Sequence, residues 1–285
     1  MRPAPLVRTK AALACLIASW KAQGRSIGFV ATMGALHRGH AELVRRAAAD
    51  NDRVLVSIFV NPLQFGPKED YARYPRALPA DRKLVAAAGA DAVYAPAMRR
   101  MYPEGFKTHV EVEGLSDLYC GRHRPGHFRG VATVVLKLFN QVRPDRAYFG
   151  EKDFQQFFLL KKMTRDLDVP VRLIAVPTVR EKDGLALSSR NAYLSPAQRA
   201  AAPTLRAALK AGRTQARRRD ATPRSVEAAI RRALRGTPLR LQYAAVTDEE
   251  TLLPSKDLRG RRRLLAAVFL GRTRLIDNLP LEKRR

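Results

Sequence analysis

Two histidines lie three residues apart in the segment MGALHRGH at Met33–His40. Gly34 and Gly39 let the backbone approach a ligand closely, because glycine has no side chain. His37 and His40 can aim both imidazole rings at one anionic group. If a helix begins near Gly39, its unpaired backbone N–H groups and its positive dipole end face the same ligand. The segment therefore indicates a phosphate site, and two surface histidines in a turn are the alternative.

Amide and cationic side chains occupy two later segments. Asn61 and Gln64 lie in NPLQF, and their amides offer both donors and acceptors, so they can hold a hydroxy acid without a full charge. An ordinary turn is the alternative for this Asn-Pro sequence. Arg124 and His127 lie in RPGHFRG, ahead of an apolar run that begins at Gly130. They are candidate substrate-binding residues, and a basic loop is the alternative.

Two more segments combine charge with hydroxyl groups. In FGEKDFQQ, Lys152 is a mobile point charge suited to phosphates, and Asp153 can accept hydrogen bonds from ribose hydroxyls. Asp153 also lies where an acidic residue simply stabilises the start of a helix. In KDGLALSSRN, two serines and Arg190 can hold a polyphosphate.

Apolar strands alternate with helices over the first 178 residues. We expect strands at 27–31, 54–60, 91–95, 145–149 and 171–176, and helices at 39–50, 78–89, 130–142 and 154–167. This alternation predicts an α/β fold, with a Rossmann-like parallel sheet covered by helices on both faces. Ligands of such sheets bind at the carboxyl ends of the strands, which is where MGALHRGH, NPLQF and FGEKDFQQ fall.

The pattern changes after Arg180. Pro196 opens an expected helix that runs to about Arg218 with Ser195 as its cap, and a second helix spans 223–235. Strands are expected at 239–246, 263–270 and 274–278. This part therefore predicts a smaller α+β C-terminal domain with a short antiparallel sheet. The expected boundary divides the chain into residues 1–178 and 179–285.

Composition excludes several classes of protein. The chain has 285 residues and no apolar stretch near the roughly 20 residues that a membrane-spanning helix needs. Near the N-terminus, Leu6, Leu13, Leu16 and Ile17 follow a helical spacing, which favours a surface helix over a signal peptide. Cysteine occurs only twice, so a disulfide framework is not expected and a reducing, cytoplasmic setting is the default.

The net charge of +27 is unusual. Residues 199–285 hold 22 Lys and Arg against 8 Asp and Glu, so the excess is densest there. Nucleic-acid binding is one interpretation of this charge. Aromatic residues are sparse among the basic ones, so no stacking platform is evident, and a basic solvated surface is the preferred interpretation.

An H-x-G-H pattern at a strand-to-helix turn resembles that of Rossmann-like enzymes that transfer adenylyl groups. All five segments in this order, with RLIDN near the C-terminus, resemble the pantoate–β-alanine ligase family, over about residues 5–279. The resemblance implies that pantoate and ATP form an enzyme-bound pantoyl adenylate, which β-alanine attacks to give pantothenate and AMP. It also implies a homodimer, an N-terminal domain that binds ATP and pantoate, and a C-terminal lid.

The resemblance assigns roles residue by residue. It implies catalytic roles for His37, His40, Lys152 and Arg190, with His40 at the position of a proton donor. Pantoate would be held by Gln64 and Gln156, with Asn61 beside them, whereas the roles of Arg124 and His127 are left open. Mg²⁺ would be held mainly by ATP oxygens and water, without a protein ligand. The residues expected to contact ATP are Met33, Gly34, Ala35, Leu36, His37, Arg38, Gly39, His40, Gly150, Glu151, Lys152, Asp153, Val179, Leu187, Ser188, Ser189 and Arg190.

Two other hypotheses remain distinguishable. A related nucleotidylyltransferase acting on a phosphorylated acceptor would need cations where Gln64 and Gln156 stand. A basic nucleic-acid-binding protein with an inactive site would show salt-dependent DNA binding without ligase activity. We expect pantoate and β-alanine as partners, and neither nucleic acid nor a membrane.

Overall fold

In the computed structural model, which describes residues 2–67 and 69–281, the chain passes from one packing unit to a second near residue 178. The first unit contains the chain up to Glu151 and then Gln156–Pro177. The second contains Lys152–Gln155 and the chain from Thr178 onward. The segment that carries Lys152 therefore packs with the second unit, although the chain returns to the first directly after it.

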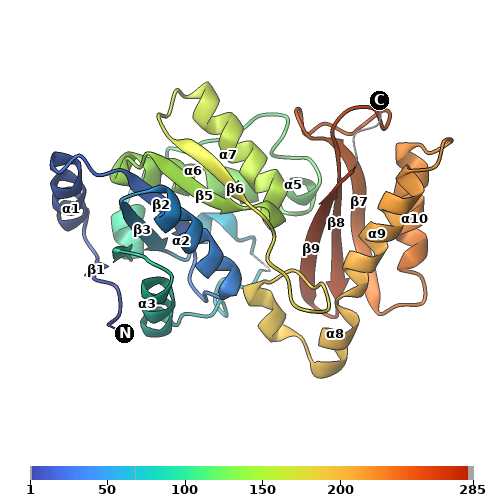
Figure 1. The fold of residues 1–285 in the computed structure, drawn as a ribbon, viewed down its shortest axis with the longest axis horizontal. Helices are drawn as coiled ribbons and strands as arrows, with labels where there is room; N and C mark the ends of the chain where they lie inside the picture. Colours follow the sequence, from blue (N-terminus) through green and yellow to red (C-terminus); the bar gives the residue numbers. More distant parts are fainter. Residues whose placement is uncertain (1, 68, 282–285) are drawn as a thin grey trace. The chain divides into compact units, whose positions relative to one another are not determined.

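Six parallel strands form the sheet of the first unit, in the order β1-β4-β3-β2-β5-β6 (Figure 1). This confirms the expected parallel α/β sheet. Because β2 lies between β3 and β5, the segments that follow these three strands leave the same edge of the sheet. The strands are β1 Leu6–Val7, β2 Ile27–Thr32, β3 Arg53–Ile58, β4 Ala92–Tyr94, β5 Arg146–Gly150 and β6 Arg172–Val176.

Helices cover both faces of this sheet. Alternate residues of a strand point to opposite faces, so Phe29 and Phe149 contact the ring of Phe139 on α6, while Val30 faces the other way. Val30 packs in a buried cluster with Val44 of α2 and residues of α3. The helices, with one 3-10 turn, are α1 Lys10–Ala22, α2 Arg38–Asp50, η1 Pro62–Gln64, α3 Leu78–Ala87, α4 Met98–Met101, α5 Cys120–His123 and α6 His127–Val142.

A 3-10 turn and a helix follow β5. They are η2 Glu151–Asp153 and α7 Phe154–Asp166. Among the described residues, no helix is both long and apolar enough to cross a membrane, and α6 has 16 residues.

The second unit is a three-stranded antiparallel sheet, in the order β7-β8-β9, with helices packed on it. Leu264, Ala266 and Val268 alternate along β8 and are buried in one cluster with Leu205 and Ile230 of the helices. This confirms the expected short antiparallel sheet. The elements are η3 Ser189–Tyr193, α8 Pro196–Ala201, α9 Thr204–Ala216, α10 Pro223–Ala233, β7 Leu239–Asp248, β8 Arg262–Leu270 and β9 Thr273–Pro280.

Three expectations about local structure were wrong. The single helix expected from Pro196 to Arg218 is two helices, α8 and α9, because Pro203 lacks the N–H that a continuous helix needs. Leu6 belongs to the short strand β1 instead of the helical pattern that begins at Lys10. The helix expected from Gly130 begins at His127, so His127 and Gly130 both lie inside α6.

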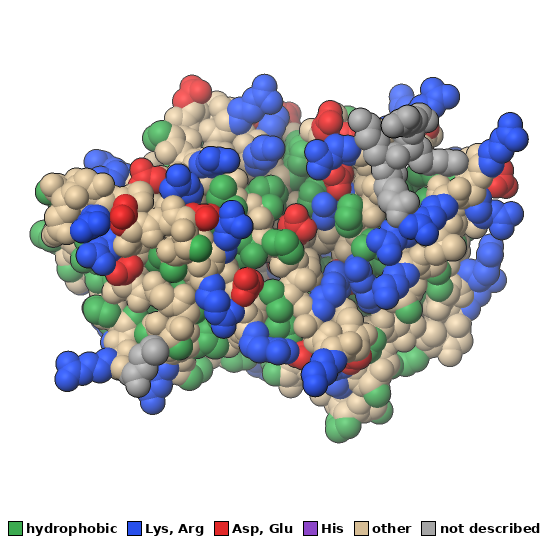
Figure 2. All heavy atoms as spheres, in the orientation of Figure 1, with side chains coloured by type: hydrophobic (Ala, Val, Ile, Leu, Met, Phe, Trp, Pro, Cys, Tyr) green, Lys and Arg blue, Asp and Glu red, His purple; other side chains and the backbone are tan. Residues whose placement is uncertain are grey.

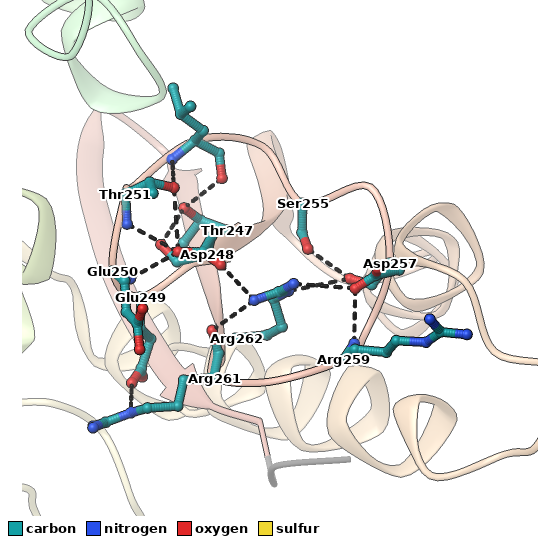
Figure 3. A network of polar contacts seen from close by, with 11 residues as sticks. Thr247, Asp248, Glu249, Glu250, Thr251, Ser255, Asp257, Arg259, Arg261 and Arg262 are labelled. Carbon is teal, nitrogen blue, oxygen red and sulfur yellow. Dashed lines mark hydrogen bonds and ion pairs between the residues drawn. The ribbon is translucent and has the colours of Figure 1, made fainter. Parts of the chain in front are cut away.

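A polar network organises the connection between β7 and β8 (Figure 3). The Asp248 carboxylate accepts hydrogen bonds from the backbone N–H of Glu250 at 2.8 Å and of Thr251 at 2.9 Å. Arg262 pairs with Asp248 and also with Asp257, where the Nη2–Oδ1 distance is 3.1 Å. Burial would raise the pKa of Asp248, but the two backbone hydrogen bonds and Arg262 outweigh it, so this pKa lies below its usual range.

Lys and Arg side chains are spread over the face of the protein drawn in Figure 2, with acidic side chains interspersed among them. Several of the arginines pair with nearby carboxylates, such as Arg46 with Asp50 at 2.8 Å and Arg261 with Glu249 at 3.1 Å. These pairs are exposed on the arginine side, and such pairs contribute little to stability. On this face, the basic side chains are exposed to solvent.

Candidate active site

The segment after β2 is held in a fixed turn by a carboxylate from α3. Gly34 and Ala35 have φ values of 84° and 51°, in the left-handed region. The buried Asp81 accepts hydrogen bonds from Ala35 N at 3.1 Å and from Leu36 N at 2.8 Å. Burial raises the pKa of Asp81, and the two backbone donors oppose that rise. Asp81 was not expected from the sequence, because it lies more than 40 residues further along the chain.

Thr32, the last residue of β2, supports the same turn. Its Oγ1 donates to Ser57 O at 2.7 Å and accepts from Gly34 N at 3.3 Å. The backbone N–H groups of Gly34, Ala35 and Leu36 are therefore all used within the protein. The donors that this segment could offer to an anion are consequently on His37, His40 and the start of α2, and not the N–H groups of the glycine turn.

The two histidines form one unit at the start of α2. His37 caps the helix, and its Nδ1 accepts a hydrogen bond from Gly39 N at 3.1 Å. The Nδ1 of His40 accepts from His37 N at 3.3 Å. The two ring centroids lie 4.1 Å apart. An imidazole that accepts at Nδ1 carries its ring proton on Nε2, so the N–H donor of each ring is at Nε2. Arg38 is the first residue of that helix.

Two amide side chains follow β3 and are buried together. Asn61 is 1% exposed and Gln64 is 8% exposed, at either end of η1. Asn61 Nδ2 donates to Gln64 Oε1 and to Gly130 O, each at 3.0 Å. Gln64 Nε2 lies 3.0 Å from Met33 Sδ, at the end of the segment after β2. The structure therefore brings Gln64 next to the histidine segment, as neighbouring parallel strands require.

The close approach of α6 to η1 requires a glycine. A Cβ atom on Gly130 would lie 2.2 Å from Leu63 O and 2.7 Å from Gln64 N. Any larger residue would push η1 away from the helix. The Gly130 carbonyl can accept from Asn61 only because this contact is so short.

Arg124 and His127 hold the backbone of Gln64. Arg124 forms a nearly buried pair with Glu69, with an Nη2–Oε2 distance of 2.5 Å, and Nη2 also donates to Gln64 O at 3.2 Å. His127 Nδ1 lies 2.8 Å from the same carbonyl oxygen, and its Nε2 lies 2.9 Å from Arg124 Nη1. Since Arg124 can only donate, His127 accepts at Nε2 and donates from Nδ1. The two residues thus fix the position of η1. The sequence did not indicate this role.

Gly150 ends β5, and Glu151 begins the 3-10 turn that follows it. Gln156 lies in the first turn of α7 and is half-buried in the first unit. Open space surrounds the position that a Cβ atom of Gly150 would take. The backbone there is therefore accessible to a ligand at the carboxyl end of β5.

Lys152 is anchored within the second unit. The side chain of Asn278 on β9 donates from Nδ2 to the Lys152 carbonyl at 2.9 Å and accepts from Arg263 Nη1 at 2.7 Å. Arg263 is 7% exposed, donates to Glu249 at 2.8 Å, and lies 4.1 Å from the ring centroid of Phe154. The Lys152 ammonium is 3.7 Å from Asp153. The segment RLIDN, which ends at Asn278, therefore holds the main chain at Lys152 in place.

The serine-rich segment forms a tight loop in the second unit. Leu187 N donates to Val179 O at 3.0 Å, and Arg180 bridges to Asp277 of β9 at 2.7 Å. Ser188 caps η3, and its Oγ accepts from Arg190 N at 3.3 Å. Leu187 is buried, whereas Ser188, Ser189 and Arg190 are half-buried. The loop thus gathers two hydroxyls and a guanidinium in one turn that Ser188 caps.

The described residues contain no group of three or more His, Cys, Asp or Glu side chains that could hold a metal ion. The donors gathered at the strand ends are instead imidazoles and amides, which suit phosphate and hydroxy-acid oxygens. A parallel sheet with a histidine pair at a strand-to-helix turn, and amides after the neighbouring strand, defines an α/β nucleotide-binding enzyme.

Comparison with known proteins defines the family. A sequence model of the family described as "Pantoate-beta-alanine ligase" matches residues 5–280. The chain belongs to the pantoate–β-alanine ligase family. It is 53% identical to the pantothenate synthetase of Moorella thermoacetica over 278 residues, covering 97% of this chain and 98% of that protein. It is also 53% identical to that of Thermus thermophilus, covering 96% and 99%.

Solved structures agree with this assignment. The crystal structure of pantothenate synthetase from Thermus thermophilus matches with a TM-score of 0.91 at 51% identity, covering 96% of this chain and 98% of that one. The ligase from Francisella tularensis matches with a TM-score of 0.80 at 33% identity, covering 97% of each chain. That structure is complexed with beta-gamma ATP and beta-alanine.

Proposed function

We propose that this enzyme condenses (R)-pantoate with β-alanine, at the expense of ATP, through an enzyme-bound pantoyl adenylate. The observation that carries the proposal is the pairing of two groups at adjacent strand ends. His37 and His40 offer Nε2–H donors at the start of α2, and Gln64 reaches the same segment with its amide, 3.0 Å from Met33. A phosphate and an uncharged polar acid chain can therefore be held side by side.

In the first step, a pantoate carboxylate oxygen attacks the α-phosphorus of ATP. The new O–P bond forms as the bond to the bridging oxygen breaks, and pyrophosphate leaves with that electron pair. Negative charge builds on the non-bridging oxygens, and the Nε2–H groups of His37 and His40 stabilise it. Lys152 and Arg190 neutralise the charge of the phosphates.

In the second step, the free amine of β-alanine attacks the acyl carbon of the adenylate. A C–N bond forms, the C–O bond to AMP breaks, and the amine loses a proton to solvent. AMP is a good leaving group, whereas the free carboxylate is a poor electrophile. Pantoate is held by Gln64 and Gln156 with Asn61 beside them, so the acyl carbon stays in place between the two steps.

Recognition of ATP is assigned to both units, each by its own residues. Met33–His40, Gly150 and Glu151 contribute from the first unit. Lys152, Asp153, Val179 and Leu187–Arg190 contribute from the second. Mg²⁺ enters with ATP, coordinated by phosphate oxygens and water, and adds to the neutralisation of phosphate charge. We further propose that the enzyme is a cytoplasmic homodimer, and light scattering of the purified protein tests the dimer.

Isotope exchange separates the two steps. Purified protein should exchange labelled pyrophosphate into ATP only when pantoate is present, and should release AMP and pantothenate only when β-alanine is added. Phosphorylated hydroxy acids and other amines serve as comparison substrates. A folded protein that shows neither activity contradicts the proposal. A stable nucleotidyl product from a phosphorylated acid would indicate the related nucleotidylyltransferase class instead.

A further inference from the structure

Tyr102 reaches the buried amide pair from the end of α4. Its hydroxyl donates to Asn61 Oδ1 at 2.7 Å. Burial raises the pKa of Tyr102 well above its usual range, so the hydroxyl keeps its proton and remains a donor. The ring is held separately, by contacts with Phe59 and Phe106. The hydroxyl can therefore be removed without removing the packing of the ring.

The Tyr102 hydroxyl is one of three groups that fix which way the Asn61 amide points, with Leu63 N–H, which donates to Oδ1 at 3.4 Å, and the Gly130 carbonyl. Asn61 Oδ1 faces the Tyr102 donor, so Nδ2 faces Gly130 O and Gln64 Oε1, each at 3.0 Å. The reverse orientation would place the Asn61 oxygen against the Gly130 carbonyl, which can only accept, and its NH₂ against the Leu63 N–H, which can only donate. Since Asn61 is 1% exposed, no bulk water can repair such a mismatch. Only one orientation of the Asn61 amide therefore satisfies all of its hydrogen-bond partners.

The orientation of Asn61 in turn decides that of Gln64. Because Asn61 donates to Gln64 Oε1, the oxygen of Gln64 points into the protein and its NH₂ group points toward Met33. A shift of the Gln64 main chain cannot turn the amide another way, because Arg124 and His127 hold the Gln64 carbonyl in place. Gln64 therefore presents a donor to the substrate, and a donor suits the carboxylate and hydroxyl oxygens of a hydroxy acid.

We propose that Tyr102 is a positioning residue that strengthens the hold on Asn61 and, through it, keeps the NH₂ group of Gln64 toward the substrate, which raises the affinity for the hydroxy acid. This inference rests on the proposed function. Tyr102 itself contacts Asn61, and it acts on the substrate only through the two amides.

The direct test is Tyr102→Phe, assayed by pantoate-dependent pyrophosphate exchange. The KM for pantoate should rise about tenfold, the worth of one buried hydrogen bond, while the KM for ATP changes less than about twofold. Tyr94→Phe is the matched control, because the Tyr94 hydroxyl also donates to an amide oxygen, Gln141 Oε1, at 2.9 Å. Equal KM values for pantoate in the two variants overturn the inference.

A double-mutant cycle separates positioning from a general structural effect. In a Gln64→Ala background, Tyr102→Phe should no longer change the KM for pantoate, because the amide that it orients is absent. An unchanged tenfold effect in that background contradicts the relay. The melting temperature of each variant is measured alongside.

A second variant covers the case in which Tyr102→Phe does not fold. Asn61→Asp keeps the acceptor for Tyr102 and removes the donor to Gln64, so it should raise the KM for pantoate at least as much. A rise in the KM for ATP of the same size would overturn the inference. If the wild-type enzyme itself shows no pantoate-dependent exchange, the proposed function fails instead, so the two failures are distinguishable.

Discussion

Asn278 Nδ2 donates a hydrogen bond to the main-chain carbonyl of Lys152 at 2.9 Å, across 126 positions of the sequence. Asn278 is oriented by Arg263, which in turn pairs with Glu249 at 2.8 Å. A buried chain of three side chains therefore fixes the backbone from which the Lys152 ammonium extends. The position of Lys152 depends on β9 as well as on its own segment.

We expect Asn278→Ala to lower the rate of adenylation about tenfold, because a mobile Lys152 backbone weakens the contact with the transferring phosphate. The measurement is the rate of pyrophosphate exchange at saturating pantoate. Gln242→Ala is the control, since it removes an amide that accepts from Arg274 in the same sheet. An equal effect of the two substitutions would show that Asn278 has no special connection to Lys152.

The histidine pair should carry most of the stabilisation of charge at the α-phosphate. Replacement of His37 or His40 by Ala removes an Nε2–H donor and a helix-capping contact, and should reduce the adenylation rate by about 10²–10³-fold. Single-turnover formation of the adenylate measures this. His109→Ala serves as the control, because His109 is exposed and contacts only the Phe106 ring in the described contacts. Wild-type rates in either site variant would refute the assigned roles.

Two glycines allow a test of backbone approach. Gly130→Ala places a Cβ atom 2.2 Å from Leu63 O, so η1 must move, and we expect a loss of at least about 2 kcal/mol of unfolding free energy. In Gly150→Ala the added Cβ atom has no neighbour within 4 Å, so stability should be unchanged.

If adenosine lies against Gly150, however, this variant raises the KM for ATP. Thermal unfolding and ATP titration distinguish the two effects, and a normal KM for ATP in Gly150→Ala would remove Gly150 from the site.

The sequence predicted the parallel sheet and the motifs that follow β2, β3 and β5, because hydrophobic periodicity and glycine turns are local properties. It did not predict Asp81, Tyr102 or Asn278. Each of these acts on a segment at least 40 positions away, and neither its residue type nor its neighbours indicate the partner. Arg124 and His127 were expected as substrate ligands on the strength of their charge. The structure shows both holding the Gln64 carbonyl, a role that depends on packing and that the sequence did not indicate.

The break at Pro203 illustrates a different limit. Pro203 lies between α8, which ends at Ala201, and α9, which begins at Thr204, and its missing N–H interrupts the helical hydrogen bonds. The sequence contains the signal for this break, because a proline inside an expected helix indicates an interruption even where the spacing of apolar residues is helical. The short strand β1 could not be found in this way, because two residues carry no periodicity and Leu6 pairs with Val93 of a distant strand.

The connection between β7 and β8 should make stability depend on pH. The pKa of Asp248 is lower in the folded than in the unfolded protein, so the folded state favours the carboxylate. The resulting stabilisation is present above the unfolded pKa, near 4, and is lost as the pH falls through the lower, folded pKa. Asp248→Asn should cost about 1 kcal/mol at pH 7 and progressively less in acid. Urea unfolding of both proteins between pH 7 and pH 3 checks this, with Asp220→Asn as the exposed control, because Asp220 is 78% exposed beside Arg218. A constant difference between wild type and Asp248→Asn across that range would show that the ionised carboxylate contributes nothing through its charge.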